Sequence, residues 1–211
     1  MTDHSIVTKV ARYYEAKLLE FGPTARGVDW NSPESQELRF QQLTKVLDGV
    51  PADEEFDLLD VGCGYGALVP SLGKRFSRFR YAGYDISEEM LRTARSLHGA
   101  ESPRVRFTGN WDAERTADFS LASGIFNVRL DCGMDAWQEH VVATLRRIDA
   151  KSRRGWSANF LTIYSDKEKM RDHLYYAEPA FVFDWCKRNA SKRVALLHDY
   201  ELFEFTIIVR R

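Results

Sequence analysis

The 211-residue sequence has few features of a membrane protein, a secreted protein or a partner of nucleic acid. Its three cysteines, Cys63, Cys132 and Cys186, are an odd number without metal-ligand spacing, which favours a reducing cytosol and no metal site. The formal net charge of −1 disfavours a nucleic-acid partner. No apolar run has membrane-spanning length, and the first residues lack the apolar stretch of a signal peptide. We expect a cytosolic globular protein, a monomer or a homodimer.

The spacing of apolar residues predicts two N-terminal helices and then an alternation of strands and helices. Residues 5–20 have helical spacing, and Ser32 followed by Pro33 is typical of a helix start. From Phe56 onward seven apolar runs are strand-like, and most are separated by helical segments, which predicts a mostly parallel sheet with helices on both faces. The last two runs are too close together for a crossover helix, so they predict a C-terminal antiparallel hairpin with a tight turn. The expected fold class is α/β with a seven-stranded sheet.

The stretch LLDVGCGYGALV at residues 58–69 predicts a ligand-binding loop. Gly62, Gly64 and Gly66 let a ligand approach the backbone beyond the end of a strand, as in dinucleotide-binding proteins. Asp60 distinguishes the ligands, since a carboxylate repels a pyrophosphate by roughly 4 kcal/mol at about 4 Å and an effective dielectric of about 20. It attracts the ammonium and sulfonium of S-adenosylmethionine. Asp60 can equally hold its own loop, and an NAD-dependent oxidoreductase is the alternative interpretation.

LLDVGCGYGALVPSL, followed by YAGYDISEEML, resembles the class I S-adenosylmethionine-dependent methyltransferases. The resemblance covers roughly residues 56–163 and the terminal hairpin. It implies that Asp85 accepts hydrogen bonds from the ribose hydroxyls, whereas Ser87 caps the next helix. The other implied cofactor contacts are Cys63 in the loop, Ile86 and Met90 beside the adenine, Asn110 (or Asp112) with Trp111 at the adenine edge, and Ser123 and Gly124 facing the methyl group.

Residues 1–50 are predicted to form a helical lid, and residues 51–211 a Rossmann-like domain with an insert at about residues 164–180. Arg39 shares a helical stripe with Leu43 and Val46. It is predicted either to form a structural ion pair or to clamp a carboxylate of the cofactor or substrate. The substrate-binding candidates, each of which can equally be a packing or surface residue, are Tyr14, Arg26, Trp30, Asn127, Tyr175 and Tyr176.

Methyl transfer is a one-step displacement that needs a base only when the nucleophile arrives protonated. His140 is the candidate base, although a histidine at such a position is usually a core residue. After the fourth predicted strand, the Asn/Asp-Pro-Pro-aromatic signature of the amide methylases is absent. The sequence therefore predicts methyl transfer to oxygen or nitrogen of a small polar metabolite. An RNA or protein methyltransferase and a binding module without turnover are further alternatives.

Overall fold

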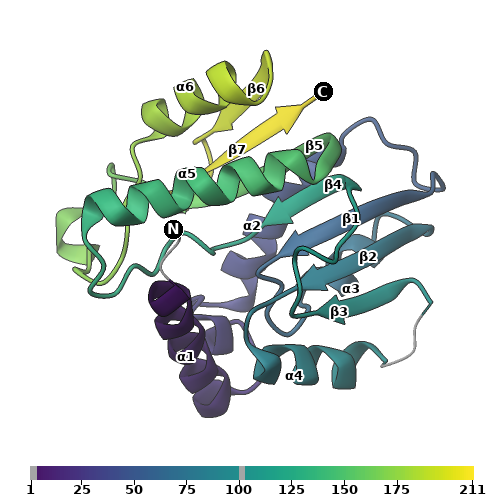
Figure 1. Ribbon diagram of the computed structural model, residues 1–211, viewed down its shortest axis with the longest axis horizontal. Coiled ribbons are helices and arrows are strands. Elements are labelled where there is room, and N and C mark those ends of the chain that lie inside the picture. The colour runs from purple at the N-terminus through teal and green to yellow at the C-terminus, as the bar shows by residue number, and fades with distance from the viewer. Residues whose placement is uncertain (1–3, 100–102) are drawn as a thin grey trace.

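The computed structural model describes residues 4–99 and 103–211, and its centre is a seven-stranded sheet between two layers of helices (Figure 1). The strand order is β3-β2-β1-β4-β5-β7-β6. Strands β1 to β5 are parallel to one another, whereas β7 is antiparallel to both β5 and β6. The strands are β1 (Phe56–Val61), β2 (Phe79–Tyr84), β3 (Val105–Thr108), β4 (Ala117–Ala122), β5 (Ser152–Leu161), β6 (Arg193–Leu197) and β7 (Glu204–Arg210). The predicted fold class is confirmed, but the predicted tight turn is wrong, because residues 198–203 separate β6 from β7.

The helices begin where the sequence provides caps. Ser32 accepts a hydrogen bond from the Ser35 N–H in a capping box at the start of α2, and Ser87 accepts one from the Met90 N–H at the start of α4. After the glycine loop, α3 begins only at Leu68, because Gly66 has a φ of +80°. The helices are α1 (His4–Phe21), α2 (Pro33–Thr44), α3 (Leu68–Gly73), α4 (Glu88–His98), α5 (Met134–Ala150) and α6 (Pro179–Asn189), with 3-10 turns η1 (Arg26–Val28), η2 (Lys45–Leu47) and η3 (Lys167–Lys169).

The alternation of side chains along each strand divides the core into two parts. Leu59 of β1 faces a core that it shares with α5 and α6, while its neighbour Leu58 faces a core shared with α2, α3 and α4. Helix α5 therefore lies across one face of the sheet, as Figure 1 shows, and α2 and α3 cover the other. Helix α2 packs on the sheet through Phe40 and Leu43, so the part of the predicted lid that lies over a cavity is α1. The division into two domains stays a prediction.

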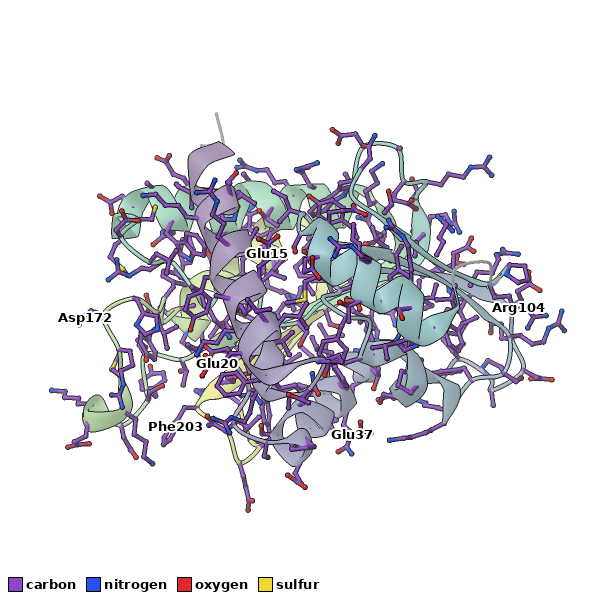
Figure 2. All side chains as sticks on the ribbon, turned by 90° about the horizontal axis from the view of Figure 1, so that it is seen from below. Glu15, Glu20, Glu37, Arg104, Asp172 and Phe203 are labelled. Carbon is purple, nitrogen blue, oxygen red and sulfur yellow. The ribbon has the colours of Figure 1, made fainter. Side chains whose placement is uncertain are left out.

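Helix α1 lies beside the carboxyl ends of the central strands (Figure 1). Glu15 projects from α1 toward α4, and its carboxylate accepts a hydrogen bond of 2.7 Å from the Ser87 hydroxyl (Figure 2). At the other end of the helix, Lys9 forms a 2.7 Å ion pair with Asp131, in the loop after β4. These two contacts fix α1 across the edge of the sheet where parallel α/β proteins bind ligands. None of the helices in residues 4–99 and 103–211 is long and apolar enough to cross a membrane.

Candidate active site

A cavity of about 600 Å³ lies at the carboxyl edge of the sheet, on both sides of the end of β1. Its walls come from α1, the segment around η1, the ends of β1, β2 and β4, the loop after β3, and α5. The strand order changes direction at β1, which is the position where open α/β sheets bind their ligands. The volume lies within the range of small-molecule and cofactor sites.

The glycine loop after β1 presents backbone to this cavity. Gly62 and Gly64 line it, with φ angles of +74° and +53°. A Cβ on Gly62 would lie 2.2 Å from the Ile125 side chain, so a larger residue has no room there. Gly66 lies outside the cavity wall, and a Cβ on it would lie 2.8 Å from the ring of His98. The first two glycines therefore face the ligand space, whereas Gly66 allows close packing behind the loop.

Asp85 follows β2 and reaches the same cavity with a fixed orientation. Its Oδ2 accepts a 2.8 Å hydrogen bond from the Gly64 N–H, and its Oδ1 accepts a 2.9 Å bond from the Ser87 N–H. Burial raises the pKa of Asp85, and these backbone donors partly oppose that rise. Ile86 and Met90 line the cavity next to it. The Asp85 carboxylate is thus held rigidly beside the glycine loop, with lone pairs left for ligand hydroxyls.

Two buried polar atoms on the cavity walls have no hydrogen-bond partner among the described residues, namely Trp111 Nε1 and Ser123 Oγ. An unsatisfied buried polar group costs about 1–3 kcal/mol, so such atoms indicate a missing ligand or water. Trp111 follows β3, and the Arg147 guanidinium covers its ring at 4.3 Å. Ser123 and Gly124 follow β4 on the opposite side of Gly62. The cavity therefore presents a rigid carboxylate, two free polar atoms and open backbone, which suits a nucleoside with polar substituents.

Asp60 does not line this cavity, contrary to the expectation that its carboxylate meets the ligand. It is buried beneath the glycine loop, where its Oδ2 accepts a 2.6 Å hydrogen bond from the Tyr81 hydroxyl. Burial raises the pKa of Asp60 to about 7; the Tyr81 hydrogen bond lowers it and the Asp85 charge raises it further. The structure therefore places Asp60 in the loop-holding role, which was the other interpretation of this residue.

Two further predicted cofactor contacts lie outside the cavity walls. The thiol of Cys63 is buried against β2, close to Gly83, and the pKa of this thiol is raised well above its ordinary value by burial. Asn110 is exposed, and its Oδ1 accepts a 3.1 Å hydrogen bond from the Ala113 N–H within a turn. Asp112, the alternative to Asn110, does line the cavity together with Trp111. The prediction that Asn110 contacts the adenine is therefore corrected. Its side-chain oxygen is already used by a backbone N–H of its own turn, as is common for asparagine in turns.

Arg39 forms a buried ion pair, which is the first of its two predicted roles, and it does not line the cavity as a clamp on the cofactor would. Its Nε and Nη2 donate to Glu204 Oε1 at 2.8 and 2.5 Å, and its guanidinium lies 3.8 Å from the centre of the Trp30 ring. The other oxygen of Glu204 accepts a 2.6 Å bond from Asn159, whose Oδ1 accepts a 2.8 Å bond from the Gly124 N–H. This buried network joins α2, β7 and β5 to the loop after β4. A glutamate and an asparagine inside apolar strands were the sequence signal for it.

Of the six substrate-binding candidates, Tyr14 and Trp30 line the cavity. Arg26 lies over the ring of Phe21 at 4.2 Å. Asn127 is buried, and its Oδ1 accepts a 3.3 Å bond from the Leu161 N–H. Tyr175 is buried away from the cavity, and the Tyr176 hydroxyl accepts a 2.9 Å bond from the Arg171 N–H. The insert at about residues 164–180 thus contributes no wall to this cavity, and four of the six candidates have structural roles.

His140 lines the cavity one turn after Trp137, with its ring 5.0 Å from the Trp137 ring. Burial lowers the pKa of His140, so its imidazole is neutral at pH 7. Several other residues that line the cavity were not predicted from the sequence. For those on α1 and α5, the sequence indication was the apolar stripe of α1 and the far half of α5. The residues that were not predicted are Val7, Val10, Ala11, Val28, Ile125, Ala143, Thr144, Arg146 and Arg147.

The fold and the cavity define an α/β protein that binds a nucleoside-type ligand at the carboxyl edge of its sheet. Residues 58–153 match the methyltransferase domain family. The chain is 50% identical over 170 residues to the Mycobacterium tuberculosis protein Rv1506c, which is named as a methyltransferase, and the match covers 77% of this chain and 97% of that protein.

Two solved structures share the fold. Magnesium protoporphyrin IX methyltransferase from Synechocystis PCC 6803, with bound S-adenosylmethionine, has a TM-score of 0.65 and 16% identity, over 97% of this chain and 96% of that one. The N-methyltransferase NodS from Bradyrhizobium japonicum WM9 has a TM-score of 0.65 and 13% identity, over 95% and 97%. The chain belongs to the class I S-adenosylmethionine-dependent methyltransferases, and S-adenosylmethionine is its cofactor.

Proposed function

We propose that this enzyme methylates an oxygen or nitrogen atom of a small metabolite inside the cavity that α1 covers. The observation that supports this most directly is the position of α1 along one wall of the cavity. Helix α1 contributes Val7, Val10, Ala11 and Tyr14 to the cavity and is held there by Glu15 and Lys9. An acceptor that reacts beneath this helix must be small, because a protein or RNA chain needs an open groove.

Within this proposal, the chain's own residues bind and orient the cofactor. Asp85 would accept hydrogen bonds from the ribose, the backbone at Gly62 and Gly64 would meet the amino-acid part, and Ile86, Met90 and Trp111 would flank the base. S-adenosylmethionine would supply an activated methyl group for a lone pair of the acceptor. The residues of the cavity would orient the two partners and limit the access of water to the reacting atoms.

His140 is the candidate base for a nucleophile that arrives protonated. Its neutral imidazole has a free lone pair, and the described residues show no hydrogen bond that uses it. An amine acceptor that arrives unprotonated would not need it. The proposed role therefore predicts a rate of methyl transfer that falls as His140 becomes protonated, and only for acceptors with an O–H or N–H proton.

A cytosolic location and a monomeric or dimeric state stay predictions.

The proposal is tested by incubating the enzyme with methyl-labelled S-adenosylmethionine and a metabolite extract, an RNA fraction and a protein fraction in parallel. We expect label in a low-molecular-mass product, whose O-methyl or N-methyl group mass spectrometry identifies. A Gly62→Val variant serves as the control for background transfer, because its side chain collides with Ile125 and blocks the loop. Label that accumulates only in RNA or protein would contradict the small-molecule acceptor.

A further inference from the structure

The side of the cavity formed by α1 and the η1 segment is free of charged side chains. Its residues are Val7, Val10, Ala11, Tyr14, Val28 and Trp30. The charged residues of the cavity lie elsewhere: Asp85 and Asp112 follow β2 and β3, and Arg146 and Arg147 are on α5. The charged part of the wall surrounds the proposed position of the nucleoside. The uncharged part is therefore the part of the wall that the acceptor would contact.

Trp30 is a rigid surface on this uncharged side. A Cβ on Gly124 would lie 2.5 Å from Trp30 Cζ2 and 2.6 Å from Cη2, so this edge of the ring is in contact with the Gly124 backbone. The Arg39 guanidinium lies 3.8 Å from the ring centre and holds it in place. The positive charge of Arg39 is paired with buried Glu204, so it is not available to attract an anionic acceptor. An aromatic surface fixed in this way favours a flat partner.

Tyr14 provides the polar group on this side of the cavity. Its hydroxyl has no hydrogen-bond partner among the described residues, whereas the hydroxyl of neighbouring Tyr13 donates a 2.6 Å bond to Asp29. Burial raises the pKa of Tyr14 well above its ordinary value, and the nearby Asp29 and Asp85 charges raise it further. The hydroxyl therefore stays neutral and can donate or accept one hydrogen bond to a ligand.

We propose that the acceptor is an uncharged, flat molecule, of the class of aromatic alcohols and aromatic amines, whose ring lies on Trp30 and whose hydroxyl or amino group faces the Tyr14 hydroxyl. This inference rests on the proposed small-molecule function and narrows it. A carboxylate or phosphate on the acceptor would lose its hydration on entering this side of the cavity and find no opposite charge there. The polarity of the acceptor is thereby confined to the atom that is methylated.

The test uses a naphthol and a hydroxynaphthoate with the same ring system, which differ by one carboxylate. Binding is measured by calorimetry with the enzyme saturated with S-adenosylhomocysteine, and methyl transfer is measured with labelled cofactor. We expect the naphthol to bind at least about tenfold more tightly and to be the better acceptor. Equal or tighter binding of the hydroxynaphthoate, or no binding of either probe, would overturn the inference.

Variants of Trp30, Tyr14 and Tyr13 distinguish a failure of this inference from a failure of the proposed function and from misfolding of the variant. Trp30→Ala should weaken naphthol binding about tenfold while S-adenosylhomocysteine binding is kept, and Trp30→Phe should restore part of it. Tyr14→Phe should lower methyl transfer to the naphthol, whereas the matched Tyr13→Phe change should leave it close to that of the unaltered enzyme. If both tyrosine changes have the same effect, the role of Tyr14 is wrong. If label enters only RNA or protein, the proposed function itself is wrong, whatever the naphthol does.

Discussion

Asp60 is buried and Asp85, 25 residues later, is half-buried, and their environments assign them different tasks. Asp60 lies under the glycine loop with a hydrogen bond from Tyr81, while Asp85 lines the cavity with two backbone donors. Both pKa values are raised by burial, but only Asp85 has a free side toward the ligand space. The direction of its side chain, and not its position beside the glycines, therefore makes Asp85 the candidate for cofactor binding.

At the residue scale, the first prediction concerns Asp85→Asn. The change removes a charged acceptor of the ribose hydroxyls, and we expect S-adenosylhomocysteine binding to weaken by about 1–3 kcal/mol, measured by calorimetry. Asp184→Asn is the matched control, because Asp184 is paired with Arg188 on the exposed side of α6. Unaltered affinity of the Asp85 variant would show that the ribose is bound elsewhere.

A second prediction at this scale concerns the pH dependence of stability. The pKa of Asp60 is raised from 3.8 in the unfolded chain to about 7 in the folded protein, so the folded state binds more protons between these values. The free energy of unfolding therefore falls as pH rises from about 4 to about 7 and is flat above that range, as far as Asp60 contributes.

Asp60→Asn should remove this contribution. The free energy of unfolding is measured by urea unfolding of both proteins at pH 5 and at pH 8. From pH 5 to pH 8, we expect the free energy of unfolding of the variant to rise by on the order of 2–4 kcal/mol relative to that of the unaltered protein. The comparison of the two proteins cancels the titration of the exposed groups. A difference in stability that does not change with pH would mean that Asp60 is ionised throughout.

At the scale of elements, the buried network of Arg39, Glu204, Asn159 and Gly124 joins α2, the last strand and the loop that faces the proposed methyl position. Glu204→Gln should leave the Arg39 guanidinium buried without an opposite charge. We expect a loss of about 3–5 kcal/mol in the free energy of unfolding, measured by urea titration.

The control for this prediction is an exposed ion pair. Arg188→Gln removes a pair on the surface of α6 and should change stability by less than about 1 kcal/mol. If Glu204→Gln is as mild as this control, the buried pair contributes little and the loop after β4 is held by packing alone.

The sequence predicted the elements well and the long-range contacts poorly. Apolar periodicity located the strands and helices, and local capping chemistry located the starts of α2 and α4 at Ser32 and Ser87. These signals are local, so one sequence contains them. The partner of Arg39 is 165 residues away, and no periodicity identifies it. The same limit explains Asn127 and Tyr175, whose side chains are used by neighbouring loops and by the core.

At the scale of the whole molecule, α1 and the rest of the chain line one cavity together. In the proposed function, a bound ligand would contact Val10, Ala11 and Tyr14 of α1. We expect hydrogen exchange of α1 amides to slow by about tenfold or more when S-adenosylhomocysteine is at 100 times its dissociation constant, measured by mass spectrometry. Helix α6 packs outside the cavity and serves as the internal control. Unchanged exchange in α1 would mean that the helix does not respond to the ligand.

The place of β7 between β5 and β6 has a consequence for biosynthesis. β7 is an inner strand of the sheet, and it is flanked on both sides by strands that precede it in the sequence. Before β7 is synthesised, β6 lacks its strand partner and the guanidinium of Arg39 lacks its counter-charge. Such late, long-range pairing is slow and leaves strand edges exposed to aggregation. Removal of β7 should therefore yield aggregated protein in the cell in place of a shortened enzyme.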